Sequence, residues 1–177
     1  MDTSKINLDS GYYNIHRSVV NYYRSLIPNN LEYYVVPFSI KKGSNIYGLI
    51  FGTHHLKGVY KFLLICWNQD PQRGEANFDI DKEKINPEKP SLFIEFNKPK
   101  KLLLYEKELQ KKILNKELLT DKDVVIYSLI NGFLPKHAKE IVSKLKKDNR
   151  INLSGGNFSE KTIANNYICK QIEIINV

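Results

Sequence analysis

The sequence predicts an α+β fold built from two successive units. Apolar residues recur every three or four positions in several runs, a spacing typical of amphipathic helices. Two β-rich runs flank a polar turn that contains Gly43, which is typical of a hairpin. A polar stretch with four prolines then separates these elements from three more helical runs. We therefore expect an N-terminal unit over 1–68, a linker over 69–99 and a C-terminal unit over 100–177.

The N-terminal unit is expected to contain a helix, a hairpin and a second helix. The first helix spans residues 12–26 and ends before Pro28. The hairpin strands span residues 32–40 and 45–52, and the second strand is so apolar that we expect both of its faces to be covered. The second helix begins near Leu56, and its inward side is expected to carry Val59, Phe62, Leu63, Ile65 and Cys66. Trp67, at its end, is expected to be a core or interface residue rather than one that stacks on a base.

The predicted linker is rich in charged and amide side chains and holds one short apolar strand at residues 91–96. Its length favours a mobile loop between Asp70 and Lys89. A metal-dependent nuclease centre would use carboxylates such as those found here, but the apolar strand flanks of such a centre are missing. We therefore interpret the carboxylates as part of a solvated loop; they are Asp70, Glu75, Asp79, Asp81 and Glu83.

Three helices are predicted in the C-terminal unit, over residues 102–118, 120–131 and 135–149. Thr120 and Asp123 have the spacing of a capping box at the start of the second helix. A glycine-containing turn and a β-rich tail follow the third helix, the tail over 167–177. Helix, helix, turn, helix and a strand pair is the order of a winged helix-turn-helix domain.

The third of these helices is expected to bury Ala138, Ile141, Val142 and Leu145, so that a basic face remains outside. Such a helix usually enters the major groove of DNA, while the strand pair touches the backbone. Lysines on this face neutralise phosphate, and Lys139 and Ser143 are the candidates for contacts to base edges. The predicted nucleic-acid-binding residues are Lys136, Lys139, Ser143, Lys144, Lys147, Arg150 and Lys161.

The composition favours a folded protein with an anionic partner. A hydrophobic content of 42% excludes a disordered chain, and 27 Lys and Arg against 19 Asp and Glu give a net charge of +8. Double-stranded DNA is the expected partner, because neutralising its phosphates releases condensed counterions. Two alternatives stay open: a lysine-rich surface that is merely solvated, and a winged helix that docks protein instead of DNA.

Cysteine usage and hydropathy exclude other classes of protein. The two cysteines, Cys66 and Cys169, are far apart and lack the spacing of a zinc site or a disulfide framework. No apolar run reaches the ~18 residues of a membrane span, and Asp2, Lys5 and Asp9 stand where a signal peptide would be apolar. We expect a cytoplasmic protein with no cofactor, no metal and no membrane contact.

Thr53, His54, His55 and Lys57 form a polar elbow between the second strand and the helix that follows it. The free N–H groups at the start of a helix attract anions, so this elbow is a possible anion or ligand site with His55 as an acid, base or anion contact. The other interpretation is structural: Thr53 or His54 caps the helix, and His55 bonds to loop carbonyls. We favour the structural interpretation, because no third metal ligand or carboxylate follows at a useful spacing.

The region from Tyr47 to Trp67 resembles part of the three-Cys-motif partner proteins, a bacterial and phage family. There an apolar strand is followed by Thr-Asn-His-x-Lys-Gly-Leu and a helix that ends in Met-Trp. Five residues of this chain fall at that spacing, Thr53, His55, Lys57, Gly58 and Trp67, while His54 replaces the usual Asn and Phe62 and Cys66 stand where Met is common.

This resemblance implies the end of a methyltransferase-like domain followed by a winged helix-turn-helix domain. The glycine-rich turn that would receive a methyl donor is absent, so the chain is expected to be a reduced relative or a C-terminal piece that does not transfer methyl groups itself. We expect a non-catalytic DNA-binding protein that positions an enzymatic partner in a bacterial or phage system. The alternatives are a fragment or subunit of a methyltransferase-like or nuclease enzyme, and a protein-docking module.

Overall fold

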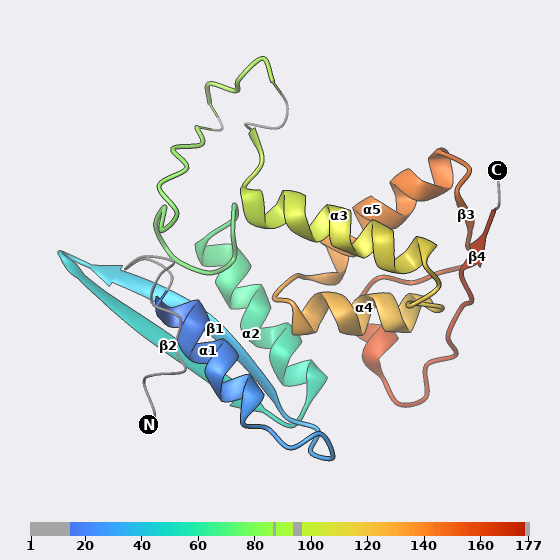
Figure 1. Cartoon of the computed structure of the whole chain (residues 1–177), viewed down its shortest axis with the longest axis horizontal. Helices are drawn as coiled ribbons and strands as arrows, with labels where there is room; N and C mark the ends of the chain where they lie inside the picture. Colours follow the sequence, from blue (N-terminus) through green and yellow to red (C-terminus); the bar gives the residue numbers. More distant parts are fainter. Residues whose placement is uncertain (1–14, 87, 94–96, 176–177) are drawn as a thin grey trace. The chain divides into compact units, whose positions relative to one another are not determined.

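The structure has helices and short antiparallel sheets, which makes it an α+β protein (Figure 1). This computed structural model describes residues 15–86, 88–93 and 97–175. The chain divides into two compact units, Met1–Pro99 and Lys100–Val177. No helix in the described part of the chain is both long enough and apolar enough to cross a membrane.

A β-hairpin forms the centre of the first unit, with one helix on each of its faces (Figure 1). Strands β1 (Tyr34–Lys42) and β2 (Asn45–Thr53) pair antiparallel in a continuous register and are joined by a two-residue turn, in which Gly43 has a φ of 62°. Helix α1 (Ile15–Ser25) covers the face that carries Val35 and Ile50. Helix α2 (Leu56–Gln69) covers the other face, where Phe62 stacks on Phe51 with ring centroids 4.6 Å apart.

The two strands differ in burial, and here one prediction was wrong. Val36 and Phe38 of β1 are buried, whereas Tyr47, Leu49 and Ile50 of β2 are 50%, 43% and 44% exposed. The apolar second strand was expected to be covered on both faces. It is not, because α1 lies mainly over β1 and the sheet has only two strands.

Helix α2 contributes much of the core of this unit. Its buried residues are Val59, Leu63 and Cys66, as expected for three of the inward positions, and Trp67. Ile65 was expected to face inward too, but it is 62% exposed. The indole of Trp67 packs so closely on Gly74, whose φ is 64°, that a Cβ atom there would lie 2.3 Å from the ring.

The first part of the predicted linker, residues 70–81, belongs to the fold of the first unit. The Ser39 N–H of β1 donates to the Glu75 carbonyl at 2.7 Å, and the Asn77 N–H donates to the Ser39 carbonyl at 3.3 Å. Ala76 and Ile80 are buried. Residues 70–81 therefore pack against the hairpin instead of forming a linker. Residues 75–77 of this stretch bond to the edge of β1 that β2 does not occupy.

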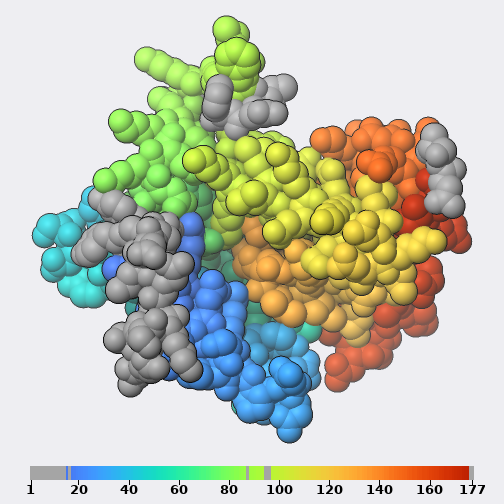
Figure 2. Space-filling model, viewed as in Figure 1, coloured from blue at the N-terminus to red at the C-terminus, as the bar shows by residue number. Residues whose placement is uncertain are grey.

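The rest of that segment is a loop that extends away from the hairpin (Figure 2). Leu92, at its far end, is 99% exposed. A strand was predicted over residues 91–96. Ser91–Phe93 are not in a strand, and residues 94–96 lie outside the described residues.

Four of the five carboxylates are ion-paired, and Asp70 accepts hydrogen bonds from the N–H groups of residues 72, 73 and 76, which corrects their interpretation as a solvated loop. Arg17 of α1 bonds Glu75 and Asp81, at 2.6 and 2.9 Å. Arg73 bonds Asp79 and Glu83 at 2.8 and 2.9 Å, and its side chain is only 3% exposed. The sequence could not reveal these pairs, since Arg17 lies 58 residues before Glu75.

The second unit packs three helices and then returns in a small sheet. Its elements are α3 (Lys100–Leu114), α4 (Asp121–Ile130), α5 (Pro135–Lys147), β3 (Ile151–Asn152), the 3-10 helix η4 (Glu160–Ile163) and β4 (Glu173–Ile174). Two boundaries differ from the predictions. Leu118 lies beyond α3, because Lys116 adopts a left-handed conformation with φ 61°. In the described part of the β-rich tail, which ends at Ile175, the strand is the two residues of β4, paired with β3, and Gln171 makes a single bridge to Thr120.

Candidate nucleic-acid interface

The start of α4 is fixed by the predicted capping box. The Thr120 hydroxyl accepts a hydrogen bond from the Asp123 N–H at 3.1 Å, and the Asp123 carboxylate accepts one from the Thr120 N–H at 2.9 Å. The helix ends at Asn131, and Gly132 turns the chain with a φ of 83°. This turn is what directs the chain into α5.

His137 fixes the start of α5. Its Nδ1 atom accepts a hydrogen bond from the Leu134 N–H at 3.1 Å, which satisfies one of the free donors of the first turn. Burial lowers the pKa of His137 to about 4, and the positive charges of Lys136 and Lys101 act in the same direction. His137 was not among the predicted site residues; a polar side chain three positions after Leu134 was the signal in the sequence.

Helix α5 has one buried and one exposed side, as the periodicity predicts. The buried positions include all four expected residues, Ala138, Ile141, Val142 and Leu145. Four of the predicted contact residues are exposed and follow one another at intervals of three or four positions, which places them on one face. This exposed stripe is Lys136, Lys139, Ser143 and Lys147.

The other predicted contact residues are placed differently. Lys144 is exposed, but its Nζ lies 3.1 Å from a carboxylate oxygen of Glu106 on α3. Arg150 is exposed just after α5, next to β3. Lys161 is exposed on η4, which packs against α4 and lies on the side of α4 away from α5 in Figure 1. The structure therefore brings Lys161 to a different surface from the α5 stripe.

Asp121 ties the long connection between β3 and β4 to the start of α4. Its buried carboxylate accepts hydrogen bonds from the N–H groups of Asn157 and Lys170, at 3.0 and 2.9 Å, and from the Tyr167 hydroxyl. Desolvation and this bond to Asp121 raise the pKa of Tyr167 to about 12. Sequence reasoning missed Asp121, because its partners lie 36 to 49 residues further along the chain.

The positive charge is concentrated in this second unit. Residues 100–177 hold 15 Lys and Arg against 9 Asp and Glu, a net charge of +6, whereas residues 1–99 hold 12 against 10, a net charge of +2. Within residues 135–150 there are six basic and two acidic residues. This uneven division gives α5 and its flanks a positive field that attracts anions.

The polar elbow of the first unit differs in part from the structural interpretation, while the ligand interpretation stays a prediction. The Thr53 hydroxyl accepts from the His55 N–H at 3.1 Å, and His54 Nδ1 lies 3.0 Å from the Glu32 carbonyl. His54, rather than His55, thus reaches a loop carbonyl. His55 and Lys57 are exposed, and His55 is the residue before α2 but makes no side-chain cap.

Metal binding gains no support from the geometry. Among residues 15–86, 88–93 and 97–175, no three His, Cys, Asp or Glu side chains gather as a metal ion would require. Cys66 is buried and Cys169 is exposed, and both are free thiols.

Comparison with known proteins gives no assignment of this interface. The chain matches no family model, no curated protein and no solved structure.

Proposed function

We propose that the second unit is a winged helix-turn-helix domain that binds double-stranded DNA through α5. The exposed stripe of Lys136, Lys139, Ser143 and Lys147, on a helix whose opposite side is buried, is the observation that carries this proposal. The order of elements supports it, since a three-helix unit with a tight turn before its last helix is followed by the antiparallel pair β3–β4.

Phosphate contacts supply most of the affinity in this proposal. Lys136, Lys139 and Lys147 are exposed lysines on a helix that contains no Arg or Asn. Lysine meets phosphate as a point charge, whereas bidentate base recognition uses Arg, Asn or Gln. We therefore expect a strong dependence on salt and a weak preference for sequence, with Lys139 and Ser143 as the residues nearest to base edges.

We further propose that the chain does not catalyse a reaction but positions an enzymatic partner in a bacterial or phage system. The ion pairs around residues 70–83 support this, because Arg17 and Arg73 occupy the carboxylates that a nuclease centre would need for a metal. The resemblance to three-Cys-motif partner proteins is part of this proposal.

Fluorescence anisotropy with labelled duplexes of two unrelated sequences tests DNA binding. Lys136→Ala, Lys139→Ala and Lys147→Ala are each expected to weaken binding to both duplexes and to reduce the slope of log K against log salt by about one unit. The triple variant is expected to lose measurable binding at about 150 mM salt. Lys107→Ala, which removes an exposed lysine from α3, is the matched control and is expected to bind like wild type.

Three outcomes would redirect the proposal. Wild-type protein that binds neither duplex in a salt-dependent way would favour the protein-docking alternative. Cleavage or methylation of DNA by the purified chain would favour the enzyme alternatives. An equal loss in the Lys107→Ala control would mean that general charge, rather than the α5 stripe, carries the binding.

A further inference from the structure

The outer edge of β2 carries unpaired backbone groups. Ser39, which lies opposite Gly48 in the hairpin, directs its N–H and C=O to residues 75–77 on the far side of β1. Because bonding alternates along an antiparallel pair, Gly48 must direct its own N–H and C=O outward from β2, as must every second residue of the strand. These outward residues are Ile46, Gly48, Ile50 and Gly52, and in the described part of the chain nothing bonds to them.

This edge lacks the features that protect sheet edges in monomeric proteins. Natural edges carry lysines, prolines or bulges that block pairing with another strand. Strand β2 is nine residues long, contains no charged residue and no proline, and pairs with β1 without a bulge. Its side chains Tyr47, Leu49 and Ile50 are also the exposed apolar groups of the hairpin.

We propose that β2 pairs antiparallel with β2 of a second copy of this chain, about a two-fold axis at Leu49. The two hairpins then form one continuous four-stranded sheet. In this register, the outward N–H and C=O groups of Ile46 face those of Gly52 of the second copy, and those of Gly48 face those of Ile50. All four outward residues of β2 thus form backbone hydrogen bonds with β2 of the second copy.

Side-chain sizes match in the same register. On the α1 face, each isoleucine of one copy stands opposite a glycine of the other. On the α2 face, Leu49 meets Leu49 of the second copy, and Tyr47 meets Phe51, an aromatic pair across strands. Large residues therefore meet small ones on one face, while apolar side chains cover each other on the opposite face.

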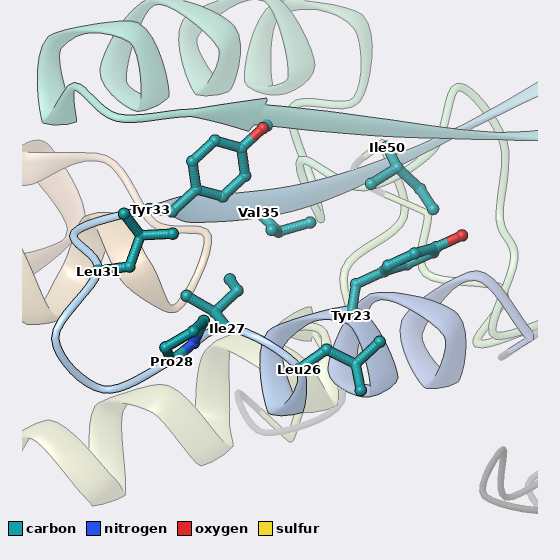
Figure 3. Close-up of a pocket in the computed structure, with 9 residues that line it drawn as sticks. Tyr23, Leu26, Ile27, Pro28, Leu31, Tyr33, Val35 and Ile50 are labelled. Carbon is teal, nitrogen blue, oxygen red and sulfur yellow. The ribbon is translucent and has the colours of Figure 1, made fainter. Parts of the chain in front are cut away.

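A cavity beside this edge is large enough for side chains of the second copy. It has a volume of about 520 Å³ and lies on the α1 face (Figure 3). Figure 3 shows Tyr23 of α1 and Leu26, which directly follows α1, opposite Val35 and Ile50 of the hairpin, with an apolar space between them. Gly52 also lines the cavity, and in the proposed register Ile46 of the second copy stands opposite Gly52.

The exposed apolar area suits a small interface. Tyr23 and Leu26 are 40% and 56% exposed, and Tyr47, Leu49 and Ile50 of β2 are 43–50% exposed, so the five residues expose roughly 400–500 Å² if each complete residue offers ~200 Å². Even with the backbone edge of the strand added, this is below the ~800 Å² per partner of a standard interface, which is the range of weaker complexes.

Charge does not oppose the pairing. Strand β2 is uncharged, and the first unit carries only +2 of the total charge of +8. Antiparallel pairing brings Lys41 and Lys42 of one copy toward the end of the other hairpin that holds Glu32 and Lys57, so opposite and like charges are both present there.

The molar mass in solution, measured by light scattering without DNA, tests the proposal. Wild type is expected to be a dimer, and Leu49→Lys and Leu49→Glu are each expected to be monomers, because like charges would face each other across the two-fold axis. An equal mixture of the two variants is expected to form a dimer again, since opposite charges then meet. Leu92→Lys makes the same change at an exposed leucine of the loop and is the matched control, expected to stay dimeric.

Cross-linking keeps the test decisive if the lysine variant folds poorly. With Cys169 replaced by Ser, Leu49→Cys is expected to form a disulfide between copies in mild oxidant, while Leu92→Cys is not.

Three results would overturn the pairing. The first is a wild-type mass of one chain up to about 100 µM, a concentration at which even a micromolar dimer would form. The second is a dimer that neither Leu49 variant disturbs. The third is a failure of the mixed variants to pair, which would point to a strand of another protein as the occupant. None of these results bears on DNA binding, because no DNA is present.

Discussion

In the first unit the carboxylates of residues 75, 79, 81 and 83 are bonded to Arg17 and Arg73, whereas in the second unit the α5 lysines at positions 136, 139 and 147 are exposed to solvent. The first unit thus uses its charges to hold an irregular segment against a hairpin. The second unit uses apolar side chains for its core and keeps its excess charge outside.

The comparison indicates which charged residues can interact with a partner. A buried pair cannot lose one member without leaving an uncompensated charge, so its charges are committed to the fold. Exposed lysines contribute little to stability, so their charge remains available to an anionic ligand. The total of +8 alone does not distinguish these roles, because both units contribute lysines and arginines to it.

Removing Arg73 is expected to have the largest effect. Arg73→Met retains the length of the side chain but leaves the Asp79 and Glu83 carboxylates without their partner, Glu83 being only 10% exposed. The free energy of unfolding is expected to fall by about 3 kcal/mol, within the range for breaking a buried pair and reduced by the partial exposure of Asp79. Urea unfolding followed by circular dichroism measures this loss.

Lys42→Met is the matched control for Arg73→Met. It removes an exposed basic residue at the last position of β1 in the same unit and is expected to change the unfolding free energy by less than about 0.5 kcal/mol. Equal losses of unfolding free energy in the two variants would show that the paired Arg73 contributes no more to stability than an exposed lysine.

His137 predicts a pH dependence in the second unit. Its pKa is lowered to about 4 in the folded state, against about 6.5 in the unfolded chain, so the unfolded chain binds more protons between these values. Its contribution to stability is complete above pH 6.5 and is lost as the pH falls toward 4, amounting to about 2 kcal/mol between pH 7 and pH 5.

His137→Asn separates this contribution from other titrating groups. The asparagine carbonyl can still accept the Leu134 N–H, but the side chain does not titrate. Unfolding free energies measured in urea at pH 5 and pH 7 are expected to differ less in the variant than in wild type. An unchanged difference would show that the His137 ring is not held neutral.

Two neighbouring lysines of α5 give a smaller, more selective test. Lys147 is exposed on the proposed DNA-binding stripe, whereas Lys144 is bonded to Glu106. Lys147→Ala is expected to weaken duplex binding about fivefold at 0.1 M salt, and Lys144→Ala about twofold, because Glu106 already offsets the Lys144 charge. Anisotropy titrations compare them, and a larger loss for Lys144→Ala would contradict this ranking.

The elbow is expected to show the smallest effects. His55→Ala should change the unfolding free energy by less than about 0.5 kcal/mol, because the side chain is exposed. His54→Ala should cost about 0.5–1 kcal/mol, because it loses the Glu32 carbonyl and the ring contact with Tyr33. Thermal unfolding of both variants measures the difference, and a larger loss at His55 would restore its structural assignment.

A melting screen with phosphate, nucleotides and adenosyl compounds tests the ligand interpretation of the same elbow. A ligand that binds only the folded chain raises its melting temperature. Because we favour the structural interpretation of the elbow, we expect none of these compounds to raise the melting temperature of wild type. Stabilisation that His55→Ala abolishes would make the elbow a binding site.

Local pattern alone determined most of the helices and the hairpin. The apolar spacing of α2 and α5, the capping box at Thr120 and the turn at Gly43 depend on neighbours within a few residues, and all of these agree with the structure. The buried side of α5, and hence the identity of its exposed lysines, follows from the same spacing. This part of the candidate site was therefore predictable.

Only the tertiary structure decided which apolar and charged groups are covered. Strand β2 is apolar along its whole length, but its exposure depends on how many strands join it and where the helices lie. The Arg17 pairs, the Asp121 contacts and the Lys144–Glu106 pair join residues 36 to 64 positions apart. A sequence read along the chain contains no spacing that specifies such partners, because burial and pairing are set by packing in three dimensions.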